Sequence, residues 1–306
     1  MTPKLSIVIA SYNDNVELAE TVKSIRATAG DEPEIVVVDD CSSLAVKYLP
    51  GVFVVRNSRR LGCGPSRFVG ACRATGEYLL IIDSHMRFTA GWYQEALRWL
   101  NPMVLHCGSC VALGKEMNPN AGGQYHGATW NFCGPDRANQ RLHQVLECVW
   151  ASEVADETPE IAAIIGACYF ISREWFFKLD PLRHLRLWGG DEQELSLKAW
   201  LAGGEIRLLK NVRIGHKFRE GRVSNNFVMP WHILYNKLFI AHSCLPPELA
   251  LRLQIHMHKD ISFNIAIKAI RNDWHLVETS QAYNNRLFTR SFDWLIAKFG
   301  LAFPAK

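Results

Sequence analysis

The sequence predicts an α/β protein in which a mostly parallel central sheet is flanked by helices and followed by a helical C-terminal extension. Two observations lead to this fold class. Over roughly the first hundred residues, apolar runs typical of buried strands alternate with helical patterns, which indicates βαβ units. Beyond about Pro230 the pattern becomes helical and aromatic, with no further βαβ unit.

The first predicted strand is the continuous apolar run at residues 5–10 (LSIVIA), which is typical of a strand buried on both faces. A helix follows, because apolar residues recur along one side between positions 18 and 25. Asn13 or Asp14 is expected to cap this helix, since short polar side chains at that place accept hydrogen bonds from free backbone N–H groups.

The second and third strands each lead into a polar loop. Residues 34–38 (EIVVV) run directly into the acidic pair at 39–40, and residues 52–55 precede the glycine-containing loop RRLGCGPSR. Pro65 in that loop suits the first turn of a helix, and this places Arg67 on the new helix.

The fourth predicted strand, residues 78–82, ends in Asp83, Ser84 and His85. Ligands of such sheets bind at the carboxyl ends of the strands. Alternate residues of an extended segment project the same way, so Asp83 and His85 can share one cation while Ser84 points elsewhere. A carboxylate with an imidazole suits Mn²⁺ better than Mg²⁺ or Ca²⁺. A surface turn at DSH and a capped turn at VVVDDCSS remain alternatives.

Composition restricts the class of protein. Of the 306 residues, 48% are hydrophobic and 21% are charged, which excludes collagen-like, low-complexity and disordered chains. No run approaches the ~18 apolar residues of a membrane-spanning helix, and the N-terminus has no signal-peptide core, so we expect a cytoplasmic protein. The nine cysteines are predicted to be free thiols, because their number is odd and Cys41, Cys72 and Cys168 lie in apolar or helical patterns. The CGSC pair at Cys107 and Cys110 has no second close pair, which argues against structural zinc.

The net charge of +4 is unevenly distributed along the chain. Residues 1–204 hold 19 basic and 23 acidic side chains, whereas residues 205–306 hold 15 and 7, a net charge of +8. We predict a sheet-containing domain at residues 1–225 and a helical, basic region at residues 226–306. A positive field of this kind raises the local concentration of anionic partners.

Six motifs occur together in the order and rough spacing of one family: SIVIASYND, VVVDDCSS, LGCGPSRFVGA with GEYLLIIDSH, IIGACYFISR, LWGGDEQELSLKAW and RIGHKFR. Over roughly residues 4–220 the chain resembles the nucleotide-diphosphosugar glycosyltransferases of GT-A fold. It is most similar to the polypeptide N-acetylgalactosaminyltransferase branch, and more broadly to the family 2 group. The resemblance implies an enzyme that transfers a sugar from a UDP-sugar to a hydroxyl group with the help of a divalent cation.

The resemblance also implies roles for the matching residues. Asp83, His85 and His216 would be ligands of Mn²⁺ or another divalent cation. Arg219, with the loop EGRVSNN, would close over the pyrophosphate, and Trp188 would cover the donor. The implied nucleotide-sugar contacts are Ser11, Tyr12, Asn13, Asp40, Arg67, Ser84, Gly166, Ala167, Trp188 and Gly190.

The WGGDEQEL motif departs from the family pattern. The N-acetylgalactosaminyltransferases retain anomeric configuration and have WGGEN, so Asp191 replaces their Glu and Glu192 stands where they have Asn. In inverting family 2 enzymes, an acidic pair at this place supplies a carboxylate base. Asp191 and Glu192 are therefore the candidate catalytic carboxylates, with Glu192 favoured as a base. We expect Glu194 to cap or pack rather than react.

The basic C-terminal region is expected to face the acceptor. Its charge favours an anionic acceptor, such as phage DNA with hydroxymethylated bases or a phosphate-bearing or lipid-linked glycan. Because no membrane anchor or lectin domain is recognisable, we expect a bacterial or viral enzyme. The aromatic residues of WHILYNKLFIAH have the helical spacing of a core. The alternatives are a protein or polysaccharide glycosyltransferase at the membrane surface and a non-catalytic nucleotide-sugar-binding module.

Overall fold

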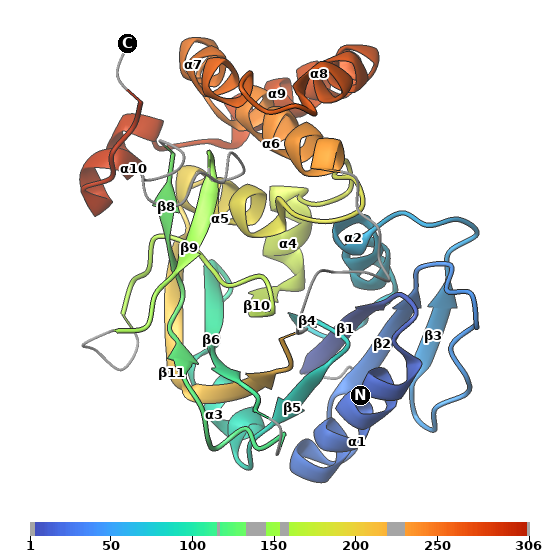
Figure 1. Cartoon of the computed structure of the whole chain (residues 1–306). Helices are drawn as coiled ribbons and strands as arrows, with labels where there is room; N and C mark the ends of the chain where they lie inside the picture. The colour runs from blue at the N-terminus through green and yellow to red at the C-terminus, as the bar shows by residue number, and fades with distance from the viewer. Residues whose placement is uncertain (1–3, 115–116, 133–144, 154–158, 219–229, 305–306) are drawn as a thin grey trace.

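The computed structural model describes residues 4–114, 117–132, 145–153, 159–218 and 230–304. Strands and helices alternate at first, and helices alone follow from α6 onward (Figure 1). The strands are β1 (Leu5–Ser11), β2 (Glu34–Asp39), β3 (Phe53–Arg56), β4 (Tyr78–Ile82), β5 (Met86–Phe88), β6 (Val104–Ala112), β7 (Gln124–Tyr125), β8 (Ala128–Asn131), β9 (Glu147–Trp150), β10 (Cys168–Ser172) and β11 (Glu205–His216). The helices are α1 (Asn15–Ala29), α2 (Cys63–Arg73), α3 (Trp92–Trp99), α4 (Arg173–Leu179), α5 (Asp191–Leu201), α6 (Pro230–Cys244), α7 (Pro247–Met257), α8 (Phe263–Asn272), α9 (Trp274–Leu287) and α10 (Phe292–Phe299).

The four predicted strands form one parallel block in the order β3-β2-β1-β4. Their bounds agree with the predicted ones to within one residue. All of β4 and most of β1 and β2 are buried, as expected for apolar strands covered on both faces. The carboxyl ends of these strands meet along one edge, and this edge collects the loops that follow Ser11, Asp39 and Ile82.

The other half of the sheet is mixed and determines the position of His216. β10 runs antiparallel between β4 and β6, while β11 pairs parallel with β6 and antiparallel with the short β5. In the β11–β5 register, His216 lies opposite Met86. Since Met86 follows His85 directly, this pairing brings His216 beside the DSH motif. The mixed sheet with flanking helices confirms the predicted α/β fold class.

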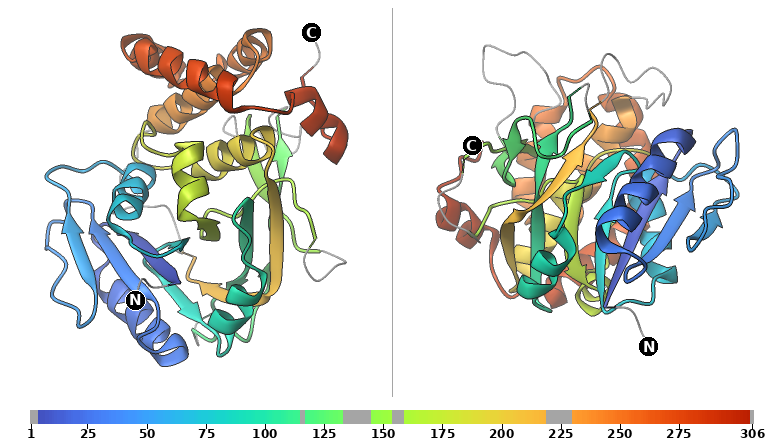
Figure 2. Two further views of the ribbon diagram at one scale, coloured as in Figure 1. Left: turned by 180° about the vertical axis from the view of Figure 1, so that it is seen from behind. Right: turned by 90° about the horizontal axis from the view of Figure 1, so that it is seen from below.

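Helices α6 to α9 form a cap beyond one end of the sheet (Figures 1 and 2). α6 is central in this cap, because it packs against α5 as well as α7, α8 and α9. Tyr235 and Phe239 of α6 are buried, which confirms the predicted core role of the WHILYNKLFIAH aromatics. The predicted domain boundary near residue 225 lies outside the described residues.

Two predictions made from composition concern membranes and cysteines. Within the described ranges, no helix is both long and apolar enough to cross a membrane. The described cysteines are free, as predicted, and Cys107 and Cys110 are buried. The one group of three potential metal ligands among the described residues includes neither of them.

Candidate active site

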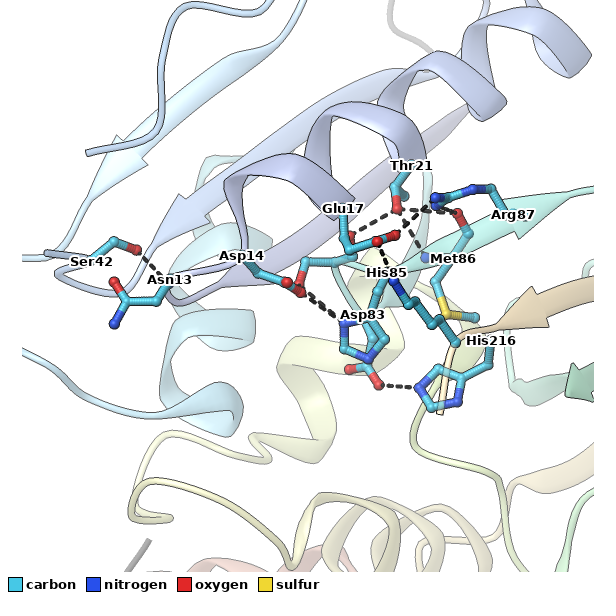
Figure 3. Close-up of polar contacts among 12 residues, drawn as sticks. Asn13, Asp14, Glu17, Thr21, Ser42, Asp83, His85, Met86, Arg87 and His216 are labelled. Carbon is cyan, nitrogen blue, oxygen red and sulfur yellow. Dashed lines mark hydrogen bonds and ion pairs between the residues drawn. The ribbon is translucent and has the colours of Figure 1, made fainter. Parts of the chain in front are cut away.

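Three predicted metal ligands converge at the carboxyl edge of the sheet. One ligand atom each of Asp83, His85 and His216 lies within 4.8 Å of the others. His216 Nε2 is 3.2 Å from Asp83 Oδ2, and the ring centroids of His85 and His216 are 5.0 Å apart (Figure 3). Burial alone would raise the pKa of Asp83, but the hydrogen bond from His216 and the charge of Arg67 outweigh it and hold that pKa well below its usual range. A permanently ionised carboxylate is what a cation site needs.

Asp14 orients His85, and this second interaction was not predicted from the sequence. Asp14 is the N-cap residue of α1, but its side chain makes no capping hydrogen bond. Instead Asp14 Oδ2 accepts hydrogen bonds from His85 Nδ1 at 2.9 Å and from Ser84 Oγ at 2.6 Å (Figure 3). With its Nδ1 used in this way, His85 has Nε2 available for a metal. The Ser84 hydroxyl thus binds Asp14, and its contact with the nucleotide sugar stays a prediction.

A second layer of charges ties α1 to the ligand-bearing strands. Glu17 of α1 accepts hydrogen bonds from Arg87 at 2.8 Å and from Lys217 at 2.5 Å. Arg87 lies in β5, and Lys217 follows His216 directly. Burial alone would raise the pKa of Glu17, but the hydrogen bonds and charges of Lys217 and Arg87 outweigh burial, so the pKa lies below its usual value. These contacts hold the segments that carry His85 and His216 against one helix.

The Arg67 guanidinium links the DSH motif to the WGGD motif. It donates to Asp83 Oδ1 at 2.6 Å through one terminal nitrogen and to Asp191 through the other. Only 3% of the Arg67 side chain is exposed. Burial opposes ionisation of Arg67, but the surrounding negative charges, chiefly Asp191, raise its pKa well above the usual value. Burial likewise raises the pKa of Asp191, and Arg67 opposes that shift. The predicted arginine thus lies between two predicted site carboxylates.

Glu192 lies beside the predicted small-residue position. Its Oε1 accepts hydrogen bonds from the backbone N–H of Gly166 at 2.6 Å and from the indole N–H of Trp150 at 3.3 Å. A Cβ at Gly166 would lie 2.7 Å from the Glu192 side chain, so the absence of a side chain permits this approach. The carbonyl of Ala167, just before β10, accepts a hydrogen bond from the Asp83 N–H at 3.3 Å. This bond links the start of β10 to the metal-ligand cluster.

The pKa of Glu192 is raised to about 8, first by burial and second by the nearby negative charge of Asp191. Oε2, in contrast to Oε1, has no hydrogen-bond partner among the described residues. The neighbouring Gln193 donates to Glu147, which also accepts from Lys237 of α6. Glu194 behaves as predicted, because it accepts from the Leu182 N–H and pairs with buried Lys198.

The acidic pair after β2 organises the loops around it. Both oxygens of Asp40 accept backbone hydrogen bonds from the glycine-containing loop, Oδ1 from Leu61 and Oδ2 from Gly62, each at 2.7 Å. Asp39 accepts from the N–H groups of Ser42 and Val46. Both carboxylates of the pair therefore hold loop backbone. The uridine contact of Asp40 stays a prediction.

The predicted nucleotide contacts Ser11, Tyr12 and Asn13 follow one another at the carboxyl end of β1. The Arg60 guanidinium lies over the Tyr12 ring, 4.0 Å from its centroid. Asn13 has a left-handed backbone, with φ of 51°, and its amide oxygen accepts from the Ser43 N–H. Ser11 Oγ is buried without a hydrogen-bond partner among the described residues. The cation–π pair gives a flat, positively charged surface where the resemblance places a base.

The WGG loop, residues 188–190, is held from the C-terminal cap. Trp188 is 60% exposed. Asn236 of α6 is buried, and its side-chain amide accepts from the Arg186 N–H and donates to the carbonyls of Arg186, Trp188 and Gly189 at 2.7 to 3.2 Å. Gly190 has φ of 92°, and a Cβ there would press on α6 at about 3.0 Å. Arg219, the predicted pyrophosphate residue, lies outside the described residues.

The donor set fits a divalent cation of the Mn²⁺ type. It offers one carboxylate and two imidazoles, a mixture that transition ions accept more readily than Mg²⁺ or Ca²⁺. His216 Nδ1 is buried and has no hydrogen-bond partner among the described residues. His85 has the carboxylate partner that metal-ligating histidines almost always have.

The chain is similar in sequence to known glycosyltransferases. Residues 6–152 match the family model described as glycosyl transferase family 2. Polypeptide N-acetylgalactosaminyltransferase 11 of Xenopus tropicalis is 28% identical over 324 residues, covering 96% of this chain and 50% of that protein. Polypeptide N-acetylgalactosaminyltransferase 8 of Drosophila melanogaster is 29% identical over 236 residues, covering 72% of this chain and 39% of that protein. The chain spans about half the length, or less, of these relatives.

Solved structures share the fold. GalNAc-T7, crystallised with UDP, GalNAc and Mn²⁺, has a TM-score of 0.70 at 20% identity, covering 97% of this chain and 57% of that one. S. aureus TarS 1–349 in complex with UDP-GlcNAc has a TM-score of 0.53 at 17% identity, covering 83% and 70%. By the family match over residues 6–152 and by its fold, the chain is similar to the glycosyltransferases of GT-A fold. Within that class, the chain resembles the polypeptide N-acetylgalactosaminyltransferase branch.

Proposed function

We propose that this chain transfers a hexose or N-acetylhexosamine from a UDP-sugar to a hydroxyl acceptor, in a reaction that requires a divalent cation. The observation that carries the proposal is the cluster of Asp83, His85 and His216 beside the buried Arg67. This cluster combines a cation site with a fixed positive charge at the carboxyl edge of the sheet. The UDP and UDP-GlcNAc ligands of the two structural neighbours support the choice of donor.

Different residues of the site would bind the cation, the base and the sugar. Asp83, His85 and His216 hold the cation, which when bound neutralises charge on the departing diphosphate. Arg67 keeps Asp83 ionised and places a second positive charge near the same group. Tyr12 with Arg60 provides a surface for the base. Trp188, exposed in the free protein, is available to cover the bound sugar.

Glu192 is our candidate for the group that takes the acceptor proton. Oε1 is anchored by Gly166 and Trp150, whereas Oε2 has no hydrogen bond within the part of the chain that the structure describes. Asp191 is less suited to this role because Arg67 occupies its carboxylate. Anomeric NMR of the product decides the matter. A β-linked product from a UDP-α-sugar assigns Glu192 as an inverting base, and an α-linked product removes it from that role.

For the acceptor, we now favour a polypeptide or glycan hydroxyl over DNA. The relatives are named as polypeptide glycosyltransferases. Tyr235 and Phe239 of the C-terminal region are in the core, where their rings are not available to stack on bases. Cations of the basic region are also used internally, since Lys237 pairs with Glu147 and Lys298 with Glu160. The anionic acceptor predicted from net charge therefore has weaker support than the sequence suggested.

The test is product analysis by mass spectrometry with a panel of UDP-sugars, in Mn²⁺ or in EDTA. The acceptors are serine- and threonine-containing peptides, neutral and acidic glycans, a lipid-linked phosphosugar and hydroxymethylated DNA. Asp83→Ala and His216→Ala are expected to lose metal-dependent transfer while keeping the circular dichroism spectrum. His275→Ala, an exposed histidine of α9, is the matched control. Full activity of His216→Ala, or full activity in EDTA, would contradict the proposal, and transfer to DNA alone would restore the original acceptor hypothesis.

A further inference from the structure

The outer helices of the cap, α7 and α8, carry large apolar side chains that nothing in the described structure covers. Leu251 and Ile255 of α7 are 51% and 68% exposed, and they lie one helical turn apart on the same face. Ile261, in the α7–α8 turn, is 96% exposed, the highest value among the exposed large apolar residues described. Ile265 of α8 is 53% exposed. Single exposed apolar residues are ordinary, but four of them between residues 251 and 265 are not.

These residues are accompanied by unpaired positive charge. Lys259, Lys268 and Arg271 are exposed, and none of them forms an ion pair within the described part of the chain. Of the acidic residues next to them in sequence, Asp260 is buried and Asp273 is paired with Arg186. Part of the surplus charge of the C-terminal region is therefore exposed on α8 and in the turn before it.

We propose that α7, α8 and the turn between them dock onto an anionic lipid surface. Aliphatic side chains next to lysine and arginine suit a bilayer interface, where the apolar groups enter the acyl boundary and the cations meet lipid phosphates. A nucleic acid would use the charges but has no comparable partner for four aliphatic side chains, because bases stack on aromatic rings. The surface is separate from the Asp83 cluster, and the inference does not depend on the proposed donor chemistry.

The geometry suits docking without loss of the catalytic edge. In Figures 1 and 2, α7 and α8 are the outermost helices, on the side of α6 away from the sheet. α6 packs against both of them and also against α5, whose first residue is Asp191. A membrane bound to α7 and α8 would therefore be linked through α6 to the active-site helix.

The experiment is vesicle flotation of the full chain, with phosphatidylcholine vesicles that contain or do not contain phosphatidylglycerol. We expect binding only to the anionic vesicles, and loss of binding as added salt shortens the screening length from ~10 Å at 0.1 M to ~3 Å at 1 M. Lys259→Gln and Lys268→Gln are each expected to weaken partitioning about five-fold. Ile261→Ser combined with Ile265→Ser should abolish it. Leu44→Ser, a 77% exposed position in the N-terminal half, should bind as the wild type does.

Three results would overturn the proposal. The first is no flotation with either vesicle. The second is a dimer, seen by analytical ultracentrifugation, that the Ile261→Ser and Ile265→Ser substitutions dissolve. The third is binding of duplex DNA that depends on Lys259 and Lys268 in the absence of vesicle binding. UDP release from the donor, measured on the same samples, keeps this result separate from the proposed function, because all substituted residues lie outside the active site.

Discussion

The guanidinium of Arg67 donates a hydrogen bond to the carboxylate of Asp191, a residue 124 positions further along the chain. Through its other terminal nitrogen the same group binds Asp83. One buried cation thus joins the glycine-containing loop, the metal-ligand motif and the first residue of α5. Removing one partner of such a pair leaves an uncompensated buried charge, which is more costly than never having buried the pair.

Arg67→Lys is expected to reduce transfer by about 10²- to 10³-fold, because lysine keeps the charge but cannot donate to two carboxylates in a fork. Arg67→Met should in addition lower the free energy of unfolding by about 3–5 kcal/mol. Initial rates and urea denaturation measure the two effects. Arg98→Lys on α3, whose guanidinium lies over the Trp99 ring away from these motifs, is the control. Wild-type rates in Arg67→Lys would show that the fork has no part in the reaction.

Asp14→Asn tests the orientation of His85. The amide can no longer act as a carboxylate acceptor for both Nδ1 and the Ser84 hydroxyl, so Mn²⁺ affinity should fall by about 10- to 100-fold. Electron paramagnetic resonance of free Mn²⁺ gives the affinity without reference to activity. Glu20→Gln on the same helix, which forms a partly exposed pair with Lys23, should leave it unchanged. Equal affinity of Asp14→Asn and the wild type would remove Asp14 from the site.

Glu192 should make the stability of the metal-free protein depend on pH. Its pKa is raised from 4.5 to about 8 on folding, so the folded state holds this proton more tightly than the unfolded state. The resulting contribution is fully present below pH ~4.5 and is lost as the pH rises towards ~8. Glu192→Gln cannot ionise, so the stability of the wild type relative to this variant should fall across that interval. Urea titrations at several pH values measure the difference, and a constant difference would contradict the assigned environment.

Gly62→Ala is expected to destabilise the fold by about 2–3 kcal/mol and to reduce donor binding. Gly62 has φ of +104°, and a Cβ there would overlap the backbone of Leu187. The overlap would push the glycine-containing loop away from Leu187, which precedes the WGG loop and whose carbonyl accepts a 2.7 Å hydrogen bond from the Cys63 N–H. Gly123→Ala, where a Cβ meets nothing within 4 Å, is the matched control. Thermal unfolding and calorimetry with UDP measure the two quantities.

The strands and the polar residues at their ends were accessible from the sequence because their signals are local. A continuous apolar run such as YLLII predicts a buried strand by itself. The side chains that follow the run then lie at the edge of the sheet. His216 was different, because only the family motif GHKFR singled it out. Its place opposite Met86 depends on the register between β11 and β5, which no local pattern encodes.

Other parts of the site arise from tertiary packing alone. Asp14 has the sequence context of a helix cap, yet the approach of His85 gives its carboxylate a stronger donor than the free N–H groups of α1. Trp150 lies on β9, far in sequence from Glu192, and nothing near it indicates a site. The net charge of the C-terminal region overstated the support for an anionic acceptor. A count of residues does not distinguish a lysine in an internal ion pair, such as Lys237 or Lys298, from one that is free to bind a partner.

Four hydrogen bonds join the Asn236 side chain to residues 186–189, so the position of the WGG loop depends on a residue of the helical cap. A chimaera that received its last helices from another glycosyltransferase would lose the amide that fixes this loop, unless the donor sequence supplied an asparagine at the same place. Recombination between relatives is therefore constrained inside α6. The amino acid at position 236 indicates whether a given pair of halves can be exchanged.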